Sequence, residues 1–130
     1  MTSTTVLFIC QHNAGRSQLA AHLLNHIAPD RYRAVSAGLN AADEINPVVA
    51  EALGELGIDT SAAKPRAVTA EDLAAADIVV TMKPGLSLPA PVAGRLIEWE
   101  FPDPDNWQLE GVRRLRDAID KQIRAGLIGK

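Results

Sequence analysis

The feature that most constrains the fold is an uninterrupted apolar run at residues 6–10, which leads directly into the polar segment CQHNAGRS at residues 10–17. A short apolar run of this kind is typical of a strand buried on both faces of a parallel sheet. Apolar residues then recur at helical spacing over residues 19–27, and Pro29 ends that pattern. The order strand, loop and helix predicts a loop whose backbone N–H groups converge beside a helix N-terminus, which suits an anion.

The rest of the chain alternates between the periodicities of helices and strands. We expect Asn46 to cap a second helix, with Pro47 in its first turn and Gly57 ending it. Helices are expected at residues 47–56, 69–76 and 109–127. Strands are expected at residues 32–36, 77–82 and 96–100. This order predicts an α/β fold, a three-layer sandwich in which a four-stranded parallel sheet carries helices on both faces. The polar face of the last helix is expected to be simply solvated.

Length and composition narrow the class of protein further. With 130 residues, the chain is expected to form a single domain over residues 1–130. The net charge of −3 offers no basic surface for nucleic acid, and the N-terminus has neither the charge nor the apolar length of a leader or membrane segment. A single cysteine excludes an internal disulfide and fits a reducing compartment. We therefore expect a cytoplasmic protein without nucleic-acid or membrane partners.

The loop carries side chains suited to chemistry on a tetrahedral oxyanion. A guanidinium such as Arg16 pairs two oxygens of phosphate or arsenate, and the same positive surroundings stabilise a thiolate at Cys10. Asn13 can bond across the loop, and Ser17 can donate a hydrogen bond to the sulfur. Gly15 is expected to supply a backbone conformation that bulkier residues avoid. The predicted oxyanion-binding residues are Gln11, His12, Asn13, Ala14, Gly15, Arg16 and Ser17.

Two carboxylates, Asp103 and Asp105, follow the fourth predicted strand. Because the carboxyl ends of parallel strands meet at one edge of a sheet, either could lie opposite Cys10 and protonate a departing oxygen. Either could instead begin a turn or cap the last helix. Trp107 is close enough in the sequence to line the same cleft, although core packing is an equal explanation for its presence.

Simpler interpretations apply to other residues. A lone cysteine at a strand end is often an inert core residue, and only the neighbouring loop residues favour a nucleophile. His22 and His26 have the i,i+4 spacing of metal ligands on a helix, but no third ligand is evident. No metal site is therefore expected, and both histidines are expected at the surface.

Three landmarks in order along the chain resemble the low-molecular-weight protein tyrosine phosphatase superfamily: the Cys-x5-Arg-Ser loop, Ser36-Ala37-Gly38 after the second strand, and Asp103-Pro104 after the fourth. Within that superfamily, the loop is similar to that of the arsenate reductase branch, because Gln18 stands where the phosphatases usually have proline. The resemblance implies that Cys10 is the nucleophile, Arg16 the oxyanion clamp and Asp103 the general acid. It also implies that Ser17 stabilises the thiolate and that Asn13 with Ser36 braces the loop.

The sequence departs from this pattern at residues 82–89, where thioredoxin-coupled relatives carry two further cysteines and this chain has none. It therefore resembles the single-cysteine arsenate–thiol transferases of arsenical detoxification, which need no tightly bound cofactor. The resemblance implies arsenate as substrate, with phosphate and sulfate as analogues, and an external low-molecular-weight thiol, mycothiol or glutathione, as co-substrate. A mycoredoxin- or glutaredoxin-like protein would complete the reduction to arsenite. The alternatives are a phosphatase that hydrolyses a phosphocysteine and, more remotely, a non-catalytic oxyanion-binding module.

Overall fold

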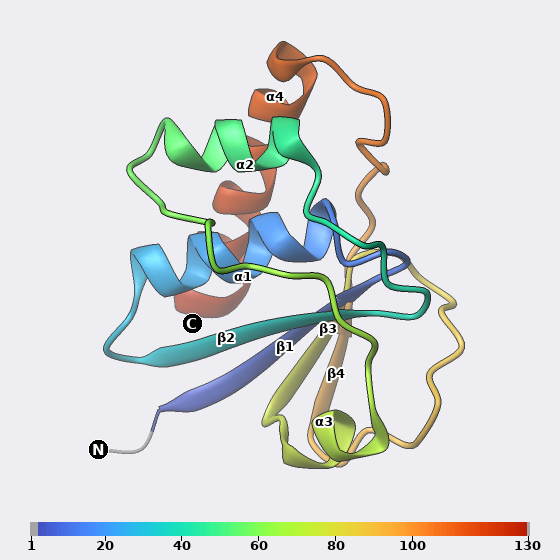
Figure 1. Cartoon of the computed structure of the whole chain (residues 1–130). Helices are drawn as coiled ribbons and strands as arrows, with labels where there is room; N and C mark the ends of the chain where they lie inside the picture. Colours follow the sequence, from blue (N-terminus) through green and yellow to red (C-terminus); the bar gives the residue numbers. More distant parts are fainter. Residues whose placement is uncertain (1–2, 130) are drawn as a thin grey trace.

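The computed structural model describes residues 3–129 of the chain; Met1 and Thr2, in the stretch predicted to carry no leader, and Lys130 lie outside the described residues. Its centre is a four-stranded parallel sheet in the order β2–β1–β3–β4 (Figure 1). The strands are β1 (Thr4–Cys10), β2 (Tyr32–Gly38), β3 (Ile78–Thr81) and β4 (Arg95–Glu98). The predicted number, order along the chain and parallel direction of the strands are confirmed.

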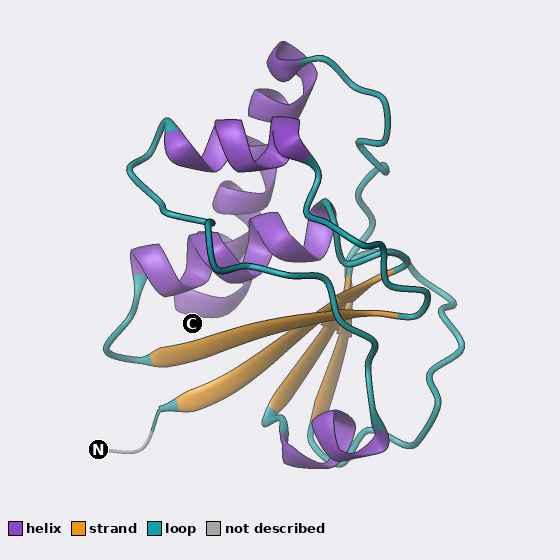
Figure 2. Cartoon of the chain, viewed as in Figure 1, coloured by secondary structure: helices purple, strands orange, loops and turns teal. Residues whose placement is uncertain are grey.

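Helices cover both faces of this sheet, as predicted (Figure 2). One face carries α1 (Arg16–Ile27), α2 (Pro47–Gly54) and α4 (Leu109–Ile123), and the other carries the short α3 (Ala70–Ala75). The last helix was predicted to run to residue 127, but α4 ends at Ile123 and the chain continues as a π-helix, Arg124–Ile128. Over residues 3–129, no helix combines the length and apolar character needed to cross a membrane.

The central strand β1 explains why its sequence is apolar without interruption. Val6 and Phe8 pack into the core beneath α1, α2 and α4, whereas Leu7 and Ile9 pack into the smaller core beneath α3. All four are fully buried because successive side chains of a strand point to opposite faces, and both faces are covered. The strand therefore delivers its last residue, Cys10, to the middle of the carboxyl edge of the sheet.

Side-chain caps set the starts of two helices where the sequence predicted them. The Asn46 carboxamide oxygen accepts from Val48 N at 2.9 Å, with Pro47 as the first helical residue of α2. Thr69 and Asp72 cap α3 reciprocally. The second helix is shorter than predicted, since α2 ends at Gly54, and the chain turns through Gly57 with a φ of 80°.

The prediction that the polar face of the last helix is simply solvated is wrong at the α2–α4 contact. Arg116 is buried, and its guanidinium donates to Ala52 O at 2.7 Å and to the Glu55 carboxylate at 2.9 Å. Arg113 donates to the same carboxylate at 3.0 Å. Hydrogen bonds from Arg113, and then from Arg116, lower the pKa of Glu55 to about 2, against the opposing effect of desolvation. This charged cluster joins the end of α2 to the middle of α4.

Candidate active site

The segment between β1 and α1 is held from outside through its carbonyl groups. Three backbone N–H groups donate to it: Leu39 N to Cys10 O at 3.2 Å, Asn40 N to Gln11 O at 2.7 Å and Ala42 N to His12 O at 2.9 Å. Asn46 N donates to Ala14 O at 3.0 Å. Within the described chain, no protein group accepts from the backbone N–H groups of residues 11–15. A loop that turns its carbonyls outward and keeps its N–H groups available has the chemistry of an anion site.

Three buried side chains form a hydrogen-bonded line that ends at the sulfur. The Asn13 carboxamide NH₂ donates to Ser17 Oγ at 2.8 Å, and Ser17 Oγ lies 2.9 Å from Cys10 Sγ. Asn13 Oδ1 accepts from Arg66 N at 2.9 Å, which fixes the carboxamide with its NH₂ group towards Ser17. Because Ser17 Oγ already accepts from Asn13, its own hydrogen is free to point at the sulfur, which is the arrangement that stabilises a thiolate.

The backbone of the loop turns sharply at Asn13, which has a φ of 54°. Asparagine tolerates this left-handed region better than most residues. Gly15 has a φ of −126° and a ψ of −91°, outside the helix and strand regions, as expected of a conformation that bulkier residues avoid. Space also requires glycine here, because a Cβ on Gly15 would lie 2.8 Å from the Pro104 ring. A Cβ at Gly38 would likewise lie 2.8 Å from Asn13 N, so the strand β2 also passes close to the loop.

Gln18 and His22 support the loop from inside α1. Gln18 is buried and donates to Asn13 O at 2.9 Å, and its carboxamide oxygen lies 3.2 Å from His22 Nε2. His22 was expected at the surface, but it is only partly exposed, and burial lowers its pKa below the usual value of 6.5. Over residues 3–129, no three His, Cys, Asp or Glu side chains cluster as a metal site would require. His22 thus contacts Gln18, the side chain that holds the loop at Asn13 O.

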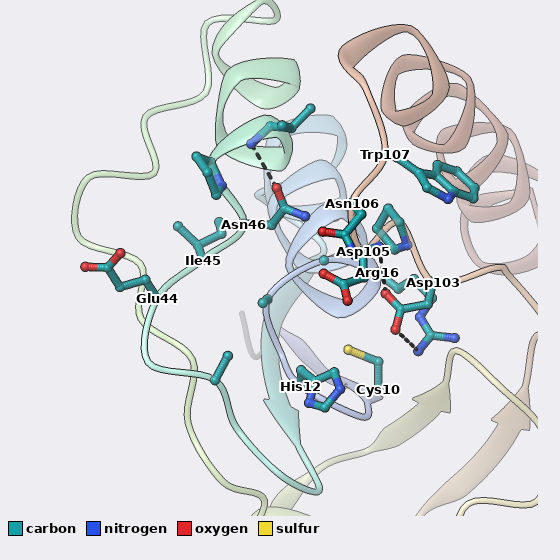
Figure 3. A pocket seen from close by; sticks show the side chains of 16 residues that line it. Cys10, His12, Arg16, Glu44, Ile45, Asn46, Asp103, Asp105, Asn106 and Trp107 are labelled. Carbon is teal, nitrogen blue, oxygen red and sulfur yellow. Dashed lines mark hydrogen bonds and ion pairs between the residues drawn. The ribbon is translucent and has the colours of Figure 1, made fainter.

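Arg16, the first residue of α1, connects the loop to the segment that follows β4. It is 6% exposed, donates to Phe101 O at 3.0 Å and lies 3.9 Å from the Asp103 carboxylate. The Asp103 side chain is 47% exposed, and its other oxygen accepts from Asp105 N at 3.1 Å. Figure 3 shows both carboxylates turned towards the side of the cavity where Cys10 lies. Of the two carboxylates, only Asp103 contacts Arg16.

Cys10 therefore lies at the base of a cavity of about 480 Å³, whose walls include Arg16, Asp103 and Trp107. The cysteine itself is only 2% exposed. The wall opposite Asp103 was not anticipated from the sequence; it is formed by residue 42 and residues 44–48, which lead into α2 and include its first turn. The resulting hollow is large enough for a tetrahedral oxyanion together with part of a second molecule.

Ser36 was predicted to brace the loop, and His12 to bind the oxyanion. Ser36 lies on β2 opposite Phe8, and among residues 3–129 no hydrogen bond joins its hydroxyl to the loop. Arg66 N and Gln18 brace Asn13 instead. His12 is exposed, lines the cavity with Cys10, and places its Nδ1 atom 3.1 Å from Asn40 O.

Comparison with known proteins matches residues 5–88 to the family described as low molecular weight phosphotyrosine protein phosphatase. The chain belongs to this family. A putative arsenate reductase of Halobacterium salinarum is 33% identical over 94% of this chain and 89% of that protein. The identification confirms the family resemblance and the α/β fold predicted from the sequence.

Two solved structures of arsenate reductases are similar to this chain. A thioredoxin-dependent arsenate reductase of Corynebacterium glutamicum has 36% identity and a TM-score of 0.77; the match covers 95% of this chain but only 59% of that longer one. An arsenate reductase solved in a phosphate binding state has 26% identity and a TM-score of 0.81, over 94% of this chain and 95% of that one. Proteins named as arsenate reductases are therefore among both the sequence relatives and the structural neighbours of this chain.

Proposed function

We propose that this family member is an arsenate reductase that works as an arsenate–thiol transferase. The observation that carries the proposal is the position of Cys10, held by Ser17 beneath a loop of available N–H groups and flanked by Arg16 and Asp103. Two points favour arsenate as the substrate. Gln18, which donates to Asn13 O, stands where the phosphatases usually have proline, and relatives of the chain are named arsenate reductase. Phosphate and sulfate would bind as analogues because they share the tetrahedral shape and the charge.

In the first step, the loop N–H groups and the Arg16 guanidinium bind arsenate above the Cys10 sulfur. The thiolate forms a bond to arsenic, one arsenic–oxygen bond breaks, and Asp103 supplies the proton with which that oxygen leaves as water. Arsenic remains pentavalent in the Cys10 adduct. The partly exposed Asp103 can exchange its proton with solvent between turnovers.

In the second step, an external low-molecular-weight thiol, mycothiol or glutathione, attacks arsenic and displaces Cys10 as a thiolate. A mycoredoxin- or glutaredoxin-like protein then attacks the sulfur of the released conjugate, and the sulfur–arsenic electron pair passes to arsenic. The products are trivalent arsenite and a mixed disulfide, so electrons balance without a tightly bound cofactor. This order follows from the sequence, in which Cys10 is the single cysteine and no second thiol can resolve the adduct. Thioredoxin alone has no internal disulfide to reduce here. Such a detoxifying role suits a cytoplasmic setting.

The test is arsenate consumption by the purified protein with mycothiol and mycoredoxin, glutathione and glutaredoxin, or thioredoxin, each supplied with its reductase. Turnover is expected with a low-molecular-weight thiol and its redoxin. Robust turnover with thioredoxin alone would overturn the proposed coupling. Asp103→Asn is expected to reduce turnover by at least about 100-fold and Asp105→Asn by far less, since only Asp103 contacts Arg16.

The second candidate function is phosphatase activity, in which water resolves a phosphocysteine with the help of Asp103. The family assignment and the half-exposed Asp103 carboxylate favour it. Comparing kcat/KM for a phosphotyrosine peptide with that for arsenate plus thiol decides between the two. A non-catalytic anion-binding module is the third candidate; slow alkylation of Cys10 at about pH 6 would favour it, because only a stabilised thiolate reacts quickly there.

A further inference from the structure

We propose that His12 is the general base that deprotonates the incoming thiol. This inference rests on the proposed function, because it concerns the step in which an external thiol releases the Cys10 adduct. His12 lies within the oxyanion loop, but its side chain is not needed there, since the loop contributes backbone N–H groups. Figure 3 shows its imidazole ring in the same cavity as the Cys10 side chain, on the open side of the loop.

The hydrogen bond of the ring fixes which nitrogen can accept a proton. His12 Nδ1 lies 3.1 Å from Asn40 O, and a carbonyl oxygen can only accept, so Nδ1 carries the hydrogen. In the neutral ring, Nε2 is then the nitrogen with the free lone pair. Among residues 3–129, no protein group hydrogen-bonds to His12 Nε2. The hydrogen bond of Nδ1 thus orients the ring, and Nε2 can accept a proton from a molecule in the cavity.

The backbone around His12 keeps this orientation in place. Asn40, which supplies the accepting carbonyl, donates its own N–H to Gln11 O at 2.7 Å, and Ala42 N donates to His12 O at 2.9 Å. Backbone hydrogen bonds therefore join residues 11–12 to residues 40–42 next to the ring. An exposed histidine held in this way loses little further freedom when a thiol arrives, which favours proton transfer in a defined geometry.

The other charged groups that line the cavity are less suited to the same task. Arg16 stays protonated, and the carboxylates are Glu44, Asp103 and Asp105. In model peptides a thiol ionises near about pH 8.5, an imidazole near about 6.5 and an aspartate near about 3.9, so imidazole is the better-matched base for a thiol. Asp103 also has a separate task, because it protonates the oxygen that leaves in the first step and contacts Arg16.

The thiol proton moves to His12 Nε2, the thiolate forms a bond to arsenic, and the bond between arsenic and Cys10 breaks with its electron pair going to the Cys10 sulfur. Arsenic stays pentavalent, and the imidazolium afterwards loses its proton to water. In the alternative hydrolytic reaction Asp103 helps the attacking water, so loss of His12 is expected to slow the thiol-dependent reaction more than hydrolysis of a phosphocysteine.

The decisive experiment compares wild type with His12→Asn, which keeps a donor for Asn40 O but has no titrating nitrogen, and with the matched control His26→Asn on the exposed side of α1. The measured quantity is kcat/KM for the thiol at about pH 6.5, with an ordinary alkyl thiol and with the more acidic trifluoroethanethiol. His12→Asn is expected to lose about 100-fold with the ordinary thiol, and much less with the acidic one or at about pH 8.5. Equal losses with both thiols at both pH values would overturn the inference.

A second measurement does not depend on arsenate. Cys10 is converted to its mixed disulfide with 4-thiopyridine, and the rate at which the same thiols displace thiopyridone is followed by absorbance in a single turnover. If His12 ionises the incoming thiol, His12→Asn is slower with the ordinary thiol near neutral pH, and the deficit shrinks as pH rises. If His12→Asn is slower in this displacement but wild type does not turn over arsenate, the proposed function alone is refuted. If wild type turns over arsenate but wild type and His12→Asn displace thiopyridone at equal rates, the role of His12 alone is refuted.

Discussion

Replacing Asn13 tests whether the loop is held together by the contacts of one side chain. Asn13 is fully buried, donates to Ser17 Oγ at 2.8 Å and accepts from Arg66 N at 2.9 Å. Each of these hydrogen bonds is worth about 1 kcal/mol net, so Asn13→Ala removes about 2 kcal/mol. Its φ of 54° adds a further cost of about 1 kcal/mol, because alanine disfavours this region. The expected loss for Asn13→Ala is therefore about 3 kcal/mol of the free energy of unfolding.

Asn13→Gly is the matched control, since glycine loses the same hydrogen bonds but accepts a positive φ. We expect Gly to destabilise by about 2 kcal/mol, less than Ala, in urea-induced unfolding followed by circular dichroism. Both variants should also slow the alkylation of Cys10 at about pH 6, because Ser17 is no longer held to donate to the sulfur. Losses below about 0.5 kcal/mol with unchanged alkylation rates would refute the assigned role of Asn13.

Two further predictions concern the α2–α4 contact and the packing of the loop. Hydrogen bonds from Arg113 and Arg116 lower the pKa of Glu55 from 4.5 to about 2, so the stabilisation by Glu55 is complete above about pH 4.5 and is lost as pH falls to about 2. Glu55→Gln should therefore lower the Tm at neutral pH, and its deficit in calorimetric scans should vanish towards pH 2; a constant deficit would contradict the pairing. Gly15→Ala places a Cβ 2.8 Å from the Pro104 ring and should therefore lower kcat. The matched control is an alanine substitution of the exposed Gly54, which should leave kcat unchanged, and the Tm of both variants shows that the loss of kcat is not a loss of folding. Unchanged kcat for Gly15→Ala would show that the ring yields without moving its neighbours.

Local signals in the sequence were enough to predict the sheet and the meeting of Cys10 and Arg16 with a carboxylate after the fourth strand, whereas the choice of Asp103 over Asp105 came from the family resemblance. The apolar run of β1 is typical of a doubly buried strand, and a parallel sheet brings the residues after its strands to one edge. Cys10, Arg16 and Asp103 therefore meet in the structure although 93 residues separate the first from the last. The Asn46 cap depended on two adjacent residues and was likewise predictable.

What the sequence did not reveal depends on contacts between distant segments. The donor to Asn13 is a backbone N–H of Arg66, 53 residues away, and backbone groups leave no signature in the identity of a side chain. The pairing of Glu55 with Arg113 spans 58 residues, whereas the helical pattern of α4 suggested only exposure to solvent. Gly15 shows the same limit, because the sequence indicated its conformation but not the Pro104 ring that leaves no space for a side chain there.

The central claim is that Cys10 forms an adduct with arsenate that only an external thiol can release. The most direct measurement is mass spectrometry of both the intact protein and the small molecules in solution after arsenate and one equivalent of mycothiol or glutathione, without any redoxin, with Cys10→Ser as the control. The account predicts a pentavalent arsenic–thiol conjugate in solution, unmodified Cys10 in the protein, and no conjugate with Cys10→Ser. Formation of the conjugate at the same rate by Cys10→Ser, or arsenite released with thioredoxin alone, would contradict it.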